Sequence, residues 1–225
     1  MAVLGLYQGK KAQKYGLTTA IDKSLIEQPI YLSYSGFADD ECADTRHHGG
    51  AERALHQYPS EHYTYWQQTY GGNLWQVSGM GENISSQGML ESDVFIGDRY
   101  QFGQAVIEVS QPRSPCFKLN KRWQVDGLAL AMQQNHKTGW LYRVIEPGLV
   151  EPDQQLELIE RPKQAMSVQQ TSHAFFSTPL EQAALEALLA QSRLSVSWRE
   201  KVDKRLSAGI VENWQIRLFG FHNKG

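Results

Sequence analysis

The chemistry that this sequence could support centres on one cysteine, Cys116, in the stretch SQPRSPCFKLN. Ser114 is a favoured capping residue for a helix, and Pro115 is favoured at the first helical position. This pattern predicts Cys116 at the second position of a helical turn, where free N–H groups and the helix dipole stabilise an anion. Arg113 and Lys118 add positive charge nearby. These effects favour the thiolate, which is both a nucleophile and a soft metal ligand.

The residues alone leave two other interpretations of Cys116 open. A lone cysteine is often a small buried hydrophobe. The sequence has no GxSxG motif of a serine hydrolase, but Cys116 could be the nucleophile of a cysteine hydrolase, with His48 or His56 as its base.

A second stretch with chemical potential is RHHGGAER. Gly49 and Gly50 allow positive φ angles, so successive N–H groups could form an anion-binding nest. Arg53 could add a forked pair of donors for a phosphate. The adjacent His47 and His48 cannot easily bind the same metal, and no Cys-x-x-Cys or His-x-x-x-His pattern accompanies them, so a zinc site is not expected. A surface turn before a strand is the alternative.

Two further polar residues are weaker candidates. Asn83, in the loop GENIS, could donate and accept hydrogen bonds at the edge of a heterocycle, or could close its own turn. Lys23, in TTAIDKS, is a lone cation at the end of a strand-like run, and most such lysines are solvated.

Composition limits the class of protein. The chain has 225 residues, a net charge of −2 and a pI near 6.4, so no overall field draws it to nucleic acid or an anionic membrane. Its apolar runs are too short to cross a bilayer, and its N-terminal residues do not form a secretory signal. Cys42 and Cys116 are expected to be free thiols of a reducing compartment. We therefore expect a cytoplasmic protein with no membrane or nucleic-acid partner.

The elements that position these residues are predicted to be mainly strands. Two helices are expected in this part, one over 59–70 that begins at Ser60 and ends at Gly71-Gly72, and one over 125–136. Many short strands without a GxGxxG or Walker motif predict a barrel-like sheet. Runs rich in β-branched and aromatic residues predict strands at 2–7, 17–24, 54–58, 94–102, 105–110, 140–146 and 155–159.

The composition changes near residue 162, which predicts two units. Residues 1–162 carry 14 basic and 19 acidic side chains, whereas residues 163–225 carry 8 basic and 5 acidic ones. The expected fold class is mainly β with appended α, a β-barrel-like domain over 1–162 followed by a small three-helix bundle over 163–225.

Start signals place the helices of the second unit. Ser167 with Gln170 and Thr178 with Glu181 form capping boxes. Ser195 is expected to cap a third helix over 196–206. Because so small a bundle has little core of its own, we expect it to pack on the barrel or on a partner chain, for example in a homodimer.

Four stretches of the sequence, in the order in which they occur, resemble the motifs of the MOSC domain family, which is named after the C-terminal domain of molybdenum cofactor sulfurase. They are HHGGAERALHQYPSEHYTYW, GENIS, SQPRSPCFKLN and GWLYRVIEPG. The similarity is greatest to its bacterial YiiM-type members, which also carry a C-terminal three-helix domain. The resemblance implies a β-barrel-like domain that binds the molybdenum cofactor, in which the dithiolene of a pterin phosphate (molybdopterin) holds molybdenum.

The resemblance also implies roles for particular residues. Cys116 matches the family's protein ligand to molybdenum and would be the catalytic and metal-binding residue. The other positions implied for cofactor binding are Lys23, Arg53 and Arg113 for the phosphate, His48, Gly49, Gly50 and Asn83 for the pocket wall, and Ser114 beside the cysteine.

The function that the resemblance implies is the reduction of N-hydroxylated compounds, such as hydroxylaminopurine-type bases, to amines, which detoxifies such bases. The sequence contains no flavin, haem or iron–sulfur motif, so a separate flavin or iron–sulfur protein is expected to donate the electrons. The alternatives are a non-catalytic carrier of the cofactor or of sulfane sulfur on Cys116, and a β-barrel interaction module whose helical tail forms a dimer.

Overall fold

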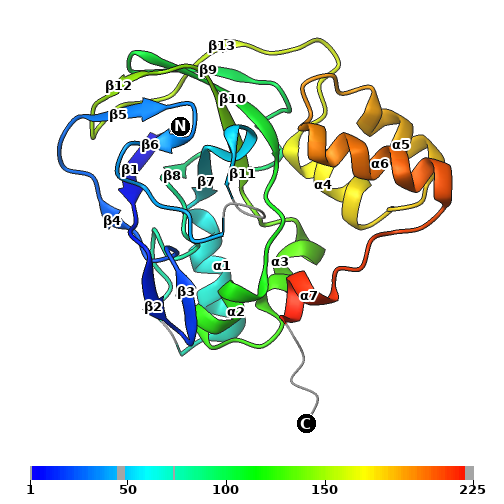
Figure 1. The fold of residues 1–225 in the computed structure, drawn as a ribbon, viewed down its shortest axis with the longest axis horizontal. Helices are drawn as coiled ribbons and strands as arrows, with labels where there is room; N and C mark the ends of the chain where they lie inside the picture. The colour runs from blue at the N-terminus through cyan, green and yellow to red at the C-terminus, as the bar shows by residue number, and fades with distance from the viewer. Residues whose placement is uncertain (1, 45–48, 73, 221–225) are drawn as a thin grey trace.

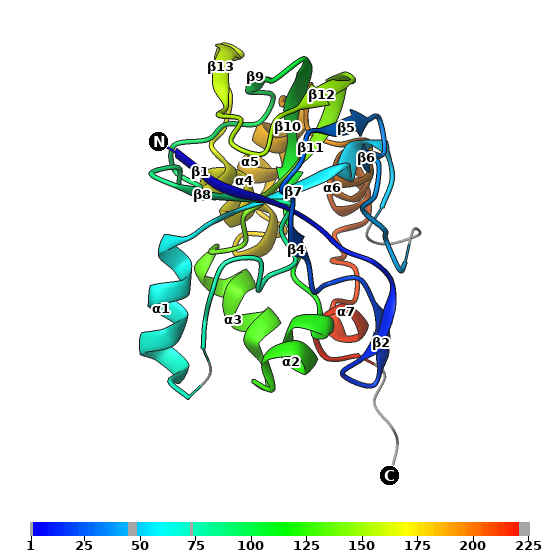
Figure 2. The same cartoon turned by 90° about the vertical axis from the view of Figure 1, so that its left-hand side faces the viewer.

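The structure is a computed structural model that describes residues 2–44, 49–72 and 74–220. A large sheet occupies one end of the molecule, and helices lie beneath it and beside it (Figures 1 and 2). The strands are β1 (Ala2–Gln8), β2 (Ala12–Lys14), β3 (Leu17–Thr19), β4 (Ser24–Leu25), β5 (Ile30–Ser33), β6 (Gly36–Phe37), β7 (Leu55–Pro59), β8 (Ile84–Gln87), β9 (Arg99–Phe102), β10 (Ala105–Pro112), β11 (Trp140–Glu146), β12 (Gly148–Val150) and β13 (Glu157–Glu160). The helices are the 3-10 turn η1 (Ala51–Arg53) and α1 (Glu61–Tyr70), α2 (Phe117–Trp123), α3 (Leu128–Asn135), α4 (Val168–Phe176), α5 (Gln182–Leu189), α6 (Val196–Ala208) and α7 (Gln215–Phe219).

The main sheet is mixed and curled. Its eight strands follow the order β13-β9-β10-β11-β7-β8-β1-β4 among the described residues. Neighbouring strands pair antiparallel, except that β7 and β8 run parallel. Register shifts interrupt the β1–β8, β10–β11 and β13–β9 ladders, and such irregularities increase the bend and twist of a sheet. The sheet therefore forms a half-barrel, which confirms the predicted mainly β class with appended helices.

Most predicted strands match observed ones, but those at 17–24 and 94–102 are only partly correct. The first contains β3 and then leaves the strand until β4 begins at Ser24. The first half of the second is a turn, because the Asp98 carboxylate accepts the N–H of Phe95 at 2.9 Å. The strand β9 begins only at Arg99. The patterns also miss β2, β5, β6, β8 and β12, which have two to four residues each. So few residues carry too little alternation to predict a strand.

Two clusters of buried apolar side chains hold the fold together. The larger one runs from the sheet into α4, α5 and α6 without a break, and it includes Trp140, Phe175 and Trp198. The rings of Phe175 and Trp198 stack with centroids 3.9 Å apart. The smaller cluster lies among α1, α2 and α3 and includes Trp66 and Trp123. The helical tail thus completes the core of the sheet, which is the first of the two arrangements expected for it.

Of the two capping boxes predicted in the tail, one is present. Ser167 accepts the N–H of Gln170, and the Gln170 side chain accepts the N–H of Ser167, at the start of α4. The box at Thr178 and Glu181 is wrong. The Thr178 hydroxyl donates back to the carbonyl of Ala174 in α4, and α5 begins after Glu181, whose backbone is extended.

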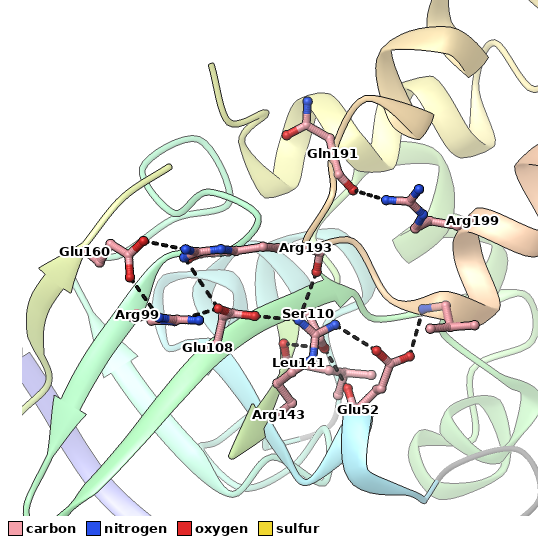
Figure 3. A network of polar contacts seen from close by, with 12 residues as sticks. Glu52, Arg99, Glu108, Ser110, Leu141, Arg143, Glu160, Gln191, Arg193 and Arg199 are labelled. Atoms are coloured by element: carbon pink, nitrogen blue, oxygen red, sulfur yellow. Dashed lines mark hydrogen bonds and ion pairs between the residues drawn. The ribbon is translucent and has the colours of Figure 1, made fainter. Parts of the chain in front are cut away.

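An ion cluster around the buried carboxylate of Glu108 joins the tail to the sheet (Figure 3). Glu108, on β10, is 2% exposed and pairs with Arg99, Arg143 and Arg193. Arg193 lies in the loop between α5 and α6, and it also donates to the carbonyl of Gly97 at 3.0 Å. A carboxylate so deeply buried is tolerated because several cations surround it.

Candidate functional site

The cysteine predicted to carry chemistry lies where β10 passes into α2. Cys116 is 5% exposed and has an extended backbone, with φ −134° and ψ 165°. It is itself the N-cap residue of α2, and its carbonyl accepts the N–H of Leu119 at 3.0 Å. The prediction that Ser114 caps this helix and Pro115 begins it is therefore wrong. A residue before proline is restricted to extended conformations, and here the chain stays extended through Cys116.

Two arginines place positive charge near this cysteine. Burial lowers the pKa of the Arg113 guanidinium, and the charge of Cys116 is the largest opposing effect. Burial likewise lowers the pKa of Arg217 to about 10, again opposed chiefly by Cys116. Because electrostatic interactions are mutual, both arginines favour the thiolate of Cys116 over the thiol.

Arg113 keeps a hydrogen-bonding atom available inside the protein. Its backbone N–H donates to the carbonyl of Gly139 at 3.1 Å. Its Nη1 is buried and has no hydrogen-bond partner among the described residues. The Nδ1 atom of His56 is likewise buried without a hydrogen-bond partner among the described residues. Burial is the main effect that lowers the pKa of His56, and the charge of Arg113 is the second. An anionic group next to Cys116 would satisfy the arginine.

Lys23 and Asn83 meet at Asp40, on the side of the site next to β1. The Lys23 ammonium is 7% exposed and pairs with the Asp40 carboxylate. Burial lowers the pKa of Lys23, and the charge of Asp40 opposes this. The Asn83 amide donates to the Asp40 carboxylate at 2.7 Å and to the carbonyl of Tyr7 at 3.1 Å, and it accepts the N–H of His56 at 3.1 Å. Asn83 therefore ties β1, β7 and the loop before β8 together.

Glu82, beside Asn83, is a buried carboxyl that the sequence analysis passes over. It is fully buried and accepts hydrogen bonds from the Tyr63 hydroxyl at 2.7 Å and from the N–H groups of Ser78 at 2.7 Å and Met80 at 3.0 Å. Burial raises the pKa of Glu82, and these hydrogen bonds oppose the rise. Its charge also acts on Arg113. An acidic side chain within the otherwise uncharged GENIS loop was the sequence signal that could have identified Glu82.

The glycine-rich stretch is described only from Gly49 onward, so His47 and His48 lie outside the described residues. Gly50 has φ 107° and ψ 163°, a backbone region that is essentially restricted to glycine, and it precedes η1. Arg53 donates through Nε to the carbonyl of Gly49 at 3.0 Å. Gly50 thus adopts the positive φ that the glycine pattern allows, and the anion-binding nest stays a prediction.

Basic side chains of the helical tail lie near this turn. Partial burial lowers the pKa of Lys201, on α6, and Glu212 opposes this. The charges of Arg217, Arg205 and Arg53 lower the pKa of Lys201 further. The turn at η1 and the tail therefore bring several cations into one region, which the sequence pattern did not predict.

The predicted site residues that the structure describes fall into three groups. Cys116, Arg113 and Ser114 share one connection between β10 and α2, and Lys23 and Asn83 meet at Asp40. Gly49, Gly50 and Arg53 form the third group, at the turn with η1. Charge interactions connect the first two groups, since both Arg113 and Lys23 act on His56. Within the described ranges, no three His, Cys, Asp or Glu side chains converge as a metal-binding set.

The half-barrel with its helical tail matches a known class of protein, the MOSC domain proteins that carry a C-terminal helical domain. The family model for the MOSC domain matches residues 44–157. The model for the YiiM-like, 3-alpha helix domain matches residues 166–209. The chain therefore belongs to the MOSC domain family and carries the helical domain of its YiiM-like members.

Individual relatives agree with this assignment. The chain is 39% identical to Protein YiiM of Escherichia coli (strain K12) over 218 residues, which cover 96% of this chain and 97% of that protein. The crystal structure of that YiiM superposes with a TM-score of 0.84, covering 98% of this chain and 100% of that one. A protein named "Reductase" from Gibberella moniliformis is 37% identical over 155 residues, which are 68% of this chain and 28% of that protein. No described helix is both long and apolar enough to span a membrane.

Proposed function

We propose that this protein binds the molybdenum cofactor through Cys116 and reduces N-hydroxylated compounds, such as hydroxylaminopurine-type bases, to amines. The observation that carries the proposal is a buried cysteine that interacts electrostatically with Arg113 and Arg217, in a chain of the MOSC family. The similarity to a protein named as a reductase supports the redox part of the proposal.

The residues around Cys116 suit such a cofactor. A thiolate is a soft ligand of the kind that suits a metal already bound to sulfur. The buried Nη1 of Arg113, which has no partner among the described residues, is a donor suited to an anionic group. The described residues offer no set of three metal-ligating side chains, which fits a metal that arrives with other ligands of its own.

In this proposal, each residue of the chain binds or orients. Cys116 would hold the metal, and Arg113 and Arg53 would neutralise the phosphate. Lys23 and Asn83 would act through Asp40, by fixing the loop that carries Glu82. His48, Gly49 and Gly50 would line the wall of the cofactor pocket, and Ser114 would contact the cofactor beside the cysteine.

The proposed reaction consumes two electrons and two protons. The N–O bond of the hydroxylamine breaks, its oxygen leaves as water, and the nitrogen is left as an amine. When bound, the cofactor would supply the two-electron redox chemistry. The electrons would come from a separate flavin or iron–sulfur protein, and we place the reaction in the cytoplasm, where thiols such as Cys42 and Cys116 stay reduced.

Replacement of the cysteine tests the proposal. We expect Cys116→Ser, produced in a host that makes the cofactor, to lose at least about tenfold in bound molybdenum, because a harder hydroxyl replaces the thiolate. Metal analysis of the purified protein and an assay of hydroxylaminopurine reduction with a chemical reductant measure the two effects. Cys42→Ser is the matched control, since Cys42 is the chain's other cysteine and neither cysteine forms a disulfide.

The same experiment separates the alternatives. Wild-type protein without molybdenum, or equal molybdenum and activity in Cys116→Ser, would overturn the proposal. Bound cofactor without turnover of any N-hydroxylated compound would favour a carrier of the cofactor. Sulfane sulfur on Cys116 without molybdenum would favour a carrier of sulfur.

A further inference from the structure

A cavity outside the Cys116 site lies where the helical tail meets the half-barrel. It has a volume of about 450 Å³ and lies between the end of α3 and the helices α4 and α5. The helices α3 and α4 are neighbours (Figure 1). Two histidines line the cavity, His136 at the end of α3 and His173 on α4, together with Glu181 at the start of α5. His173 and Glu181 are exposed, so an ion can enter from solvent.

The two imidazole rings lie close enough together to share one metal ion. Their centroids are 5.6 Å apart, and their planes are inclined by 72°. Because an imidazole nitrogen binds zinc at about 2.0–2.1 Å, two rings on one tetrahedral ion have centroids about 5 Å apart. A small rotation of the exposed His173 side chain would therefore bring both rings to one ion.

Hydrogen bonds fix the direction in which the His136 ring points. His136 closes α3 in a left-handed conformation, with φ 61° and ψ 14°. Its Nδ1 lies 3.0 Å from the hydroxyl of the buried Ser172, and its Nε2 lies 3.2 Å from the hydroxyl of Ser177. Ser177 follows His173 by four residues at the end of α4, and residues four apart lie on one face of a helix. The Nε2 atom of His136 therefore faces the strip of α4 that carries His173.

The surroundings of the two rings suit a divalent cation. A metal-binding histidine usually has its other ring nitrogen in a hydrogen bond that orients the ring, and Ser172 gives His136 such a partner. The His173 ring makes no hydrogen bond to another described residue, so a metal ion would displace only the exposed Ser177 hydroxyl. The Glu181 carboxylate lines the same cavity and adds negative charge. Imidazole nitrogen is a preferred ligand of zinc, copper and nickel.

We propose that His136 and His173 form a binding site for one divalent transition-metal ion of the zinc type. The described residues contain no convergent set of three ligating side chains, so water would complete the coordination. His136 belongs to the MOSC domain match and His173 to that of the helical domain. A bound ion would thus hold the tail against the half-barrel. The inference is independent of the proposed function, because it uses none of the residues proposed to bind the cofactor.

Zinc binding to the tag-free, full-length protein tests this site. Isothermal titration calorimetry with Zn²⁺ measures the affinity, and thermal unfolding with and without Zn²⁺ measures the stabilisation. We expect one such ion per chain, and a rise of about 5 °C in the unfolding midpoint at about 100 times the dissociation constant. His136→Gln and His173→Gln should each weaken the binding by at least about tenfold, because each removes one of two protein ligands.

Two further variants serve as controls. Gln169→Ala is the matched one, because Gln169 lines the same cavity but has no imidazole. It should bind zinc as the wild type does. Cys116→Ser should also keep the binding, which separates this site from the candidate cofactor site. Unfolding midpoints measured with a chelator show that each variant is folded before zinc is added, and His173→Gln changes an exposed side chain.

Three results would overturn the inference. The first is wild-type protein that shows no saturable binding at up to about 1 mM zinc. The second is binding that persists unchanged in both histidine variants, which would place the ion elsewhere. The third is binding that disappears in Cys116→Ser, which would place the ion at the cysteine. Zinc binding through the two histidines in a protein that never binds molybdenum would uphold this inference and reject the proposed function.

Discussion

At the residue scale, the chemistry of this chain depends on how its buried charges are neutralised. Arg205 is 1% exposed, yet it pairs with Glu212 through two hydrogen bonds, at 2.7 and 3.0 Å, and donates to the carbonyl of Phe175 at 2.7 Å. Arg113, by contrast, has a buried nitrogen with no partner among the described residues. The paired arginine stabilises the fold, and the one with an unused donor is the candidate for binding.

The Arg205–Glu212 pair makes stability depend on pH. Burial raises the pKa of Glu212, but the hydrogen bonds from Arg205 and Trp214 outweigh it and lower that pKa to about 2, from 4.5. The stabilisation is therefore complete above pH 4.5 and disappears as the pH falls towards 2. We expect Glu212→Gln to lower the free energy of unfolding at pH 7 by about 2 kcal/mol, after allowance for solvent screening.

Urea denaturation at several pH values measures this effect. The difference between wild type and Glu212→Gln should shrink at acidic pH, while the exposed control Glu157→Gln should change little at any pH. A difference that stays constant with pH would contradict the assigned role of the pair.

At the element scale, helix ends determine where the helices of the tail lie. The helix α4 starts with a complete capping box, and α6 starts at Ser195 without a hydrogen bond from the capping side chain. Ser167 and Ser195 both occupy the N-cap position of a helix, but only the Ser167 side chain accepts a capping hydrogen bond. Sequence patterns predict both helix starts, yet only the structure tells which cap is formed.

This difference predicts unequal effects of the same substitution. Ser167→Ala removes a capping bond and should lower the free energy of unfolding by about 1 kcal/mol. Ser195→Ala, at a cap with no such bond, should cost clearly less. Chemical denaturation of both variants provides the measurement, and equal losses would show that the capping box does not stabilise α4.

At the scale of the whole molecule, the helical tail and the half-barrel form one packed body. The larger apolar cluster runs through both, and Arg193 joins the two through Glu108 and Glu160 (Figure 3). The Glu52 carboxylate, beside the glycine-rich turn, accepts the N–H of Val196 at the start of α6 at 2.8 Å. The tail thus supports the turn that is proposed to line the cofactor pocket.

Removing the arginine at this junction should loosen the tail. Arg193→Gln leaves Glu108 with fewer cations, so we expect faster hydrogen exchange in α4, α5 and α6 by about tenfold or more, which corresponds to a loss of about 1.4 kcal/mol. Exchange in β7 and β11 should change much less. Lys163→Gln, an exposed lysine at the same junction, is the control. Uniform acceleration over the whole chain would mean that Arg193 stabilises the fold globally.

Local patterns predicted the elements whose signals lie within a few residues. The helix α1 begins after Ser60 and ends at Gly71 as expected, because its start and stop residues are adjacent to it in the chain. The predicted start of α2 was wrong, because the true start depends on the extended path of the chain from the end of β10 to Cys116. Helix α7 has only five residues, too few for a periodic pattern to predict.

The sequence by itself determined the mainly β class, the helical tail and the family, since alternation, capping residues and ordered motifs are properties of neighbouring residues. It also identified Cys116 as the residue most suited to chemistry. Only the tertiary structure decided which charges surround that thiol. Arg217 lies 101 positions after Cys116 in the numbering, and its guanidinium reaches the Pro115 carbonyl because α7 packs on α2. Electrostatic interactions depend on distance in space, and folding alone sets that distance.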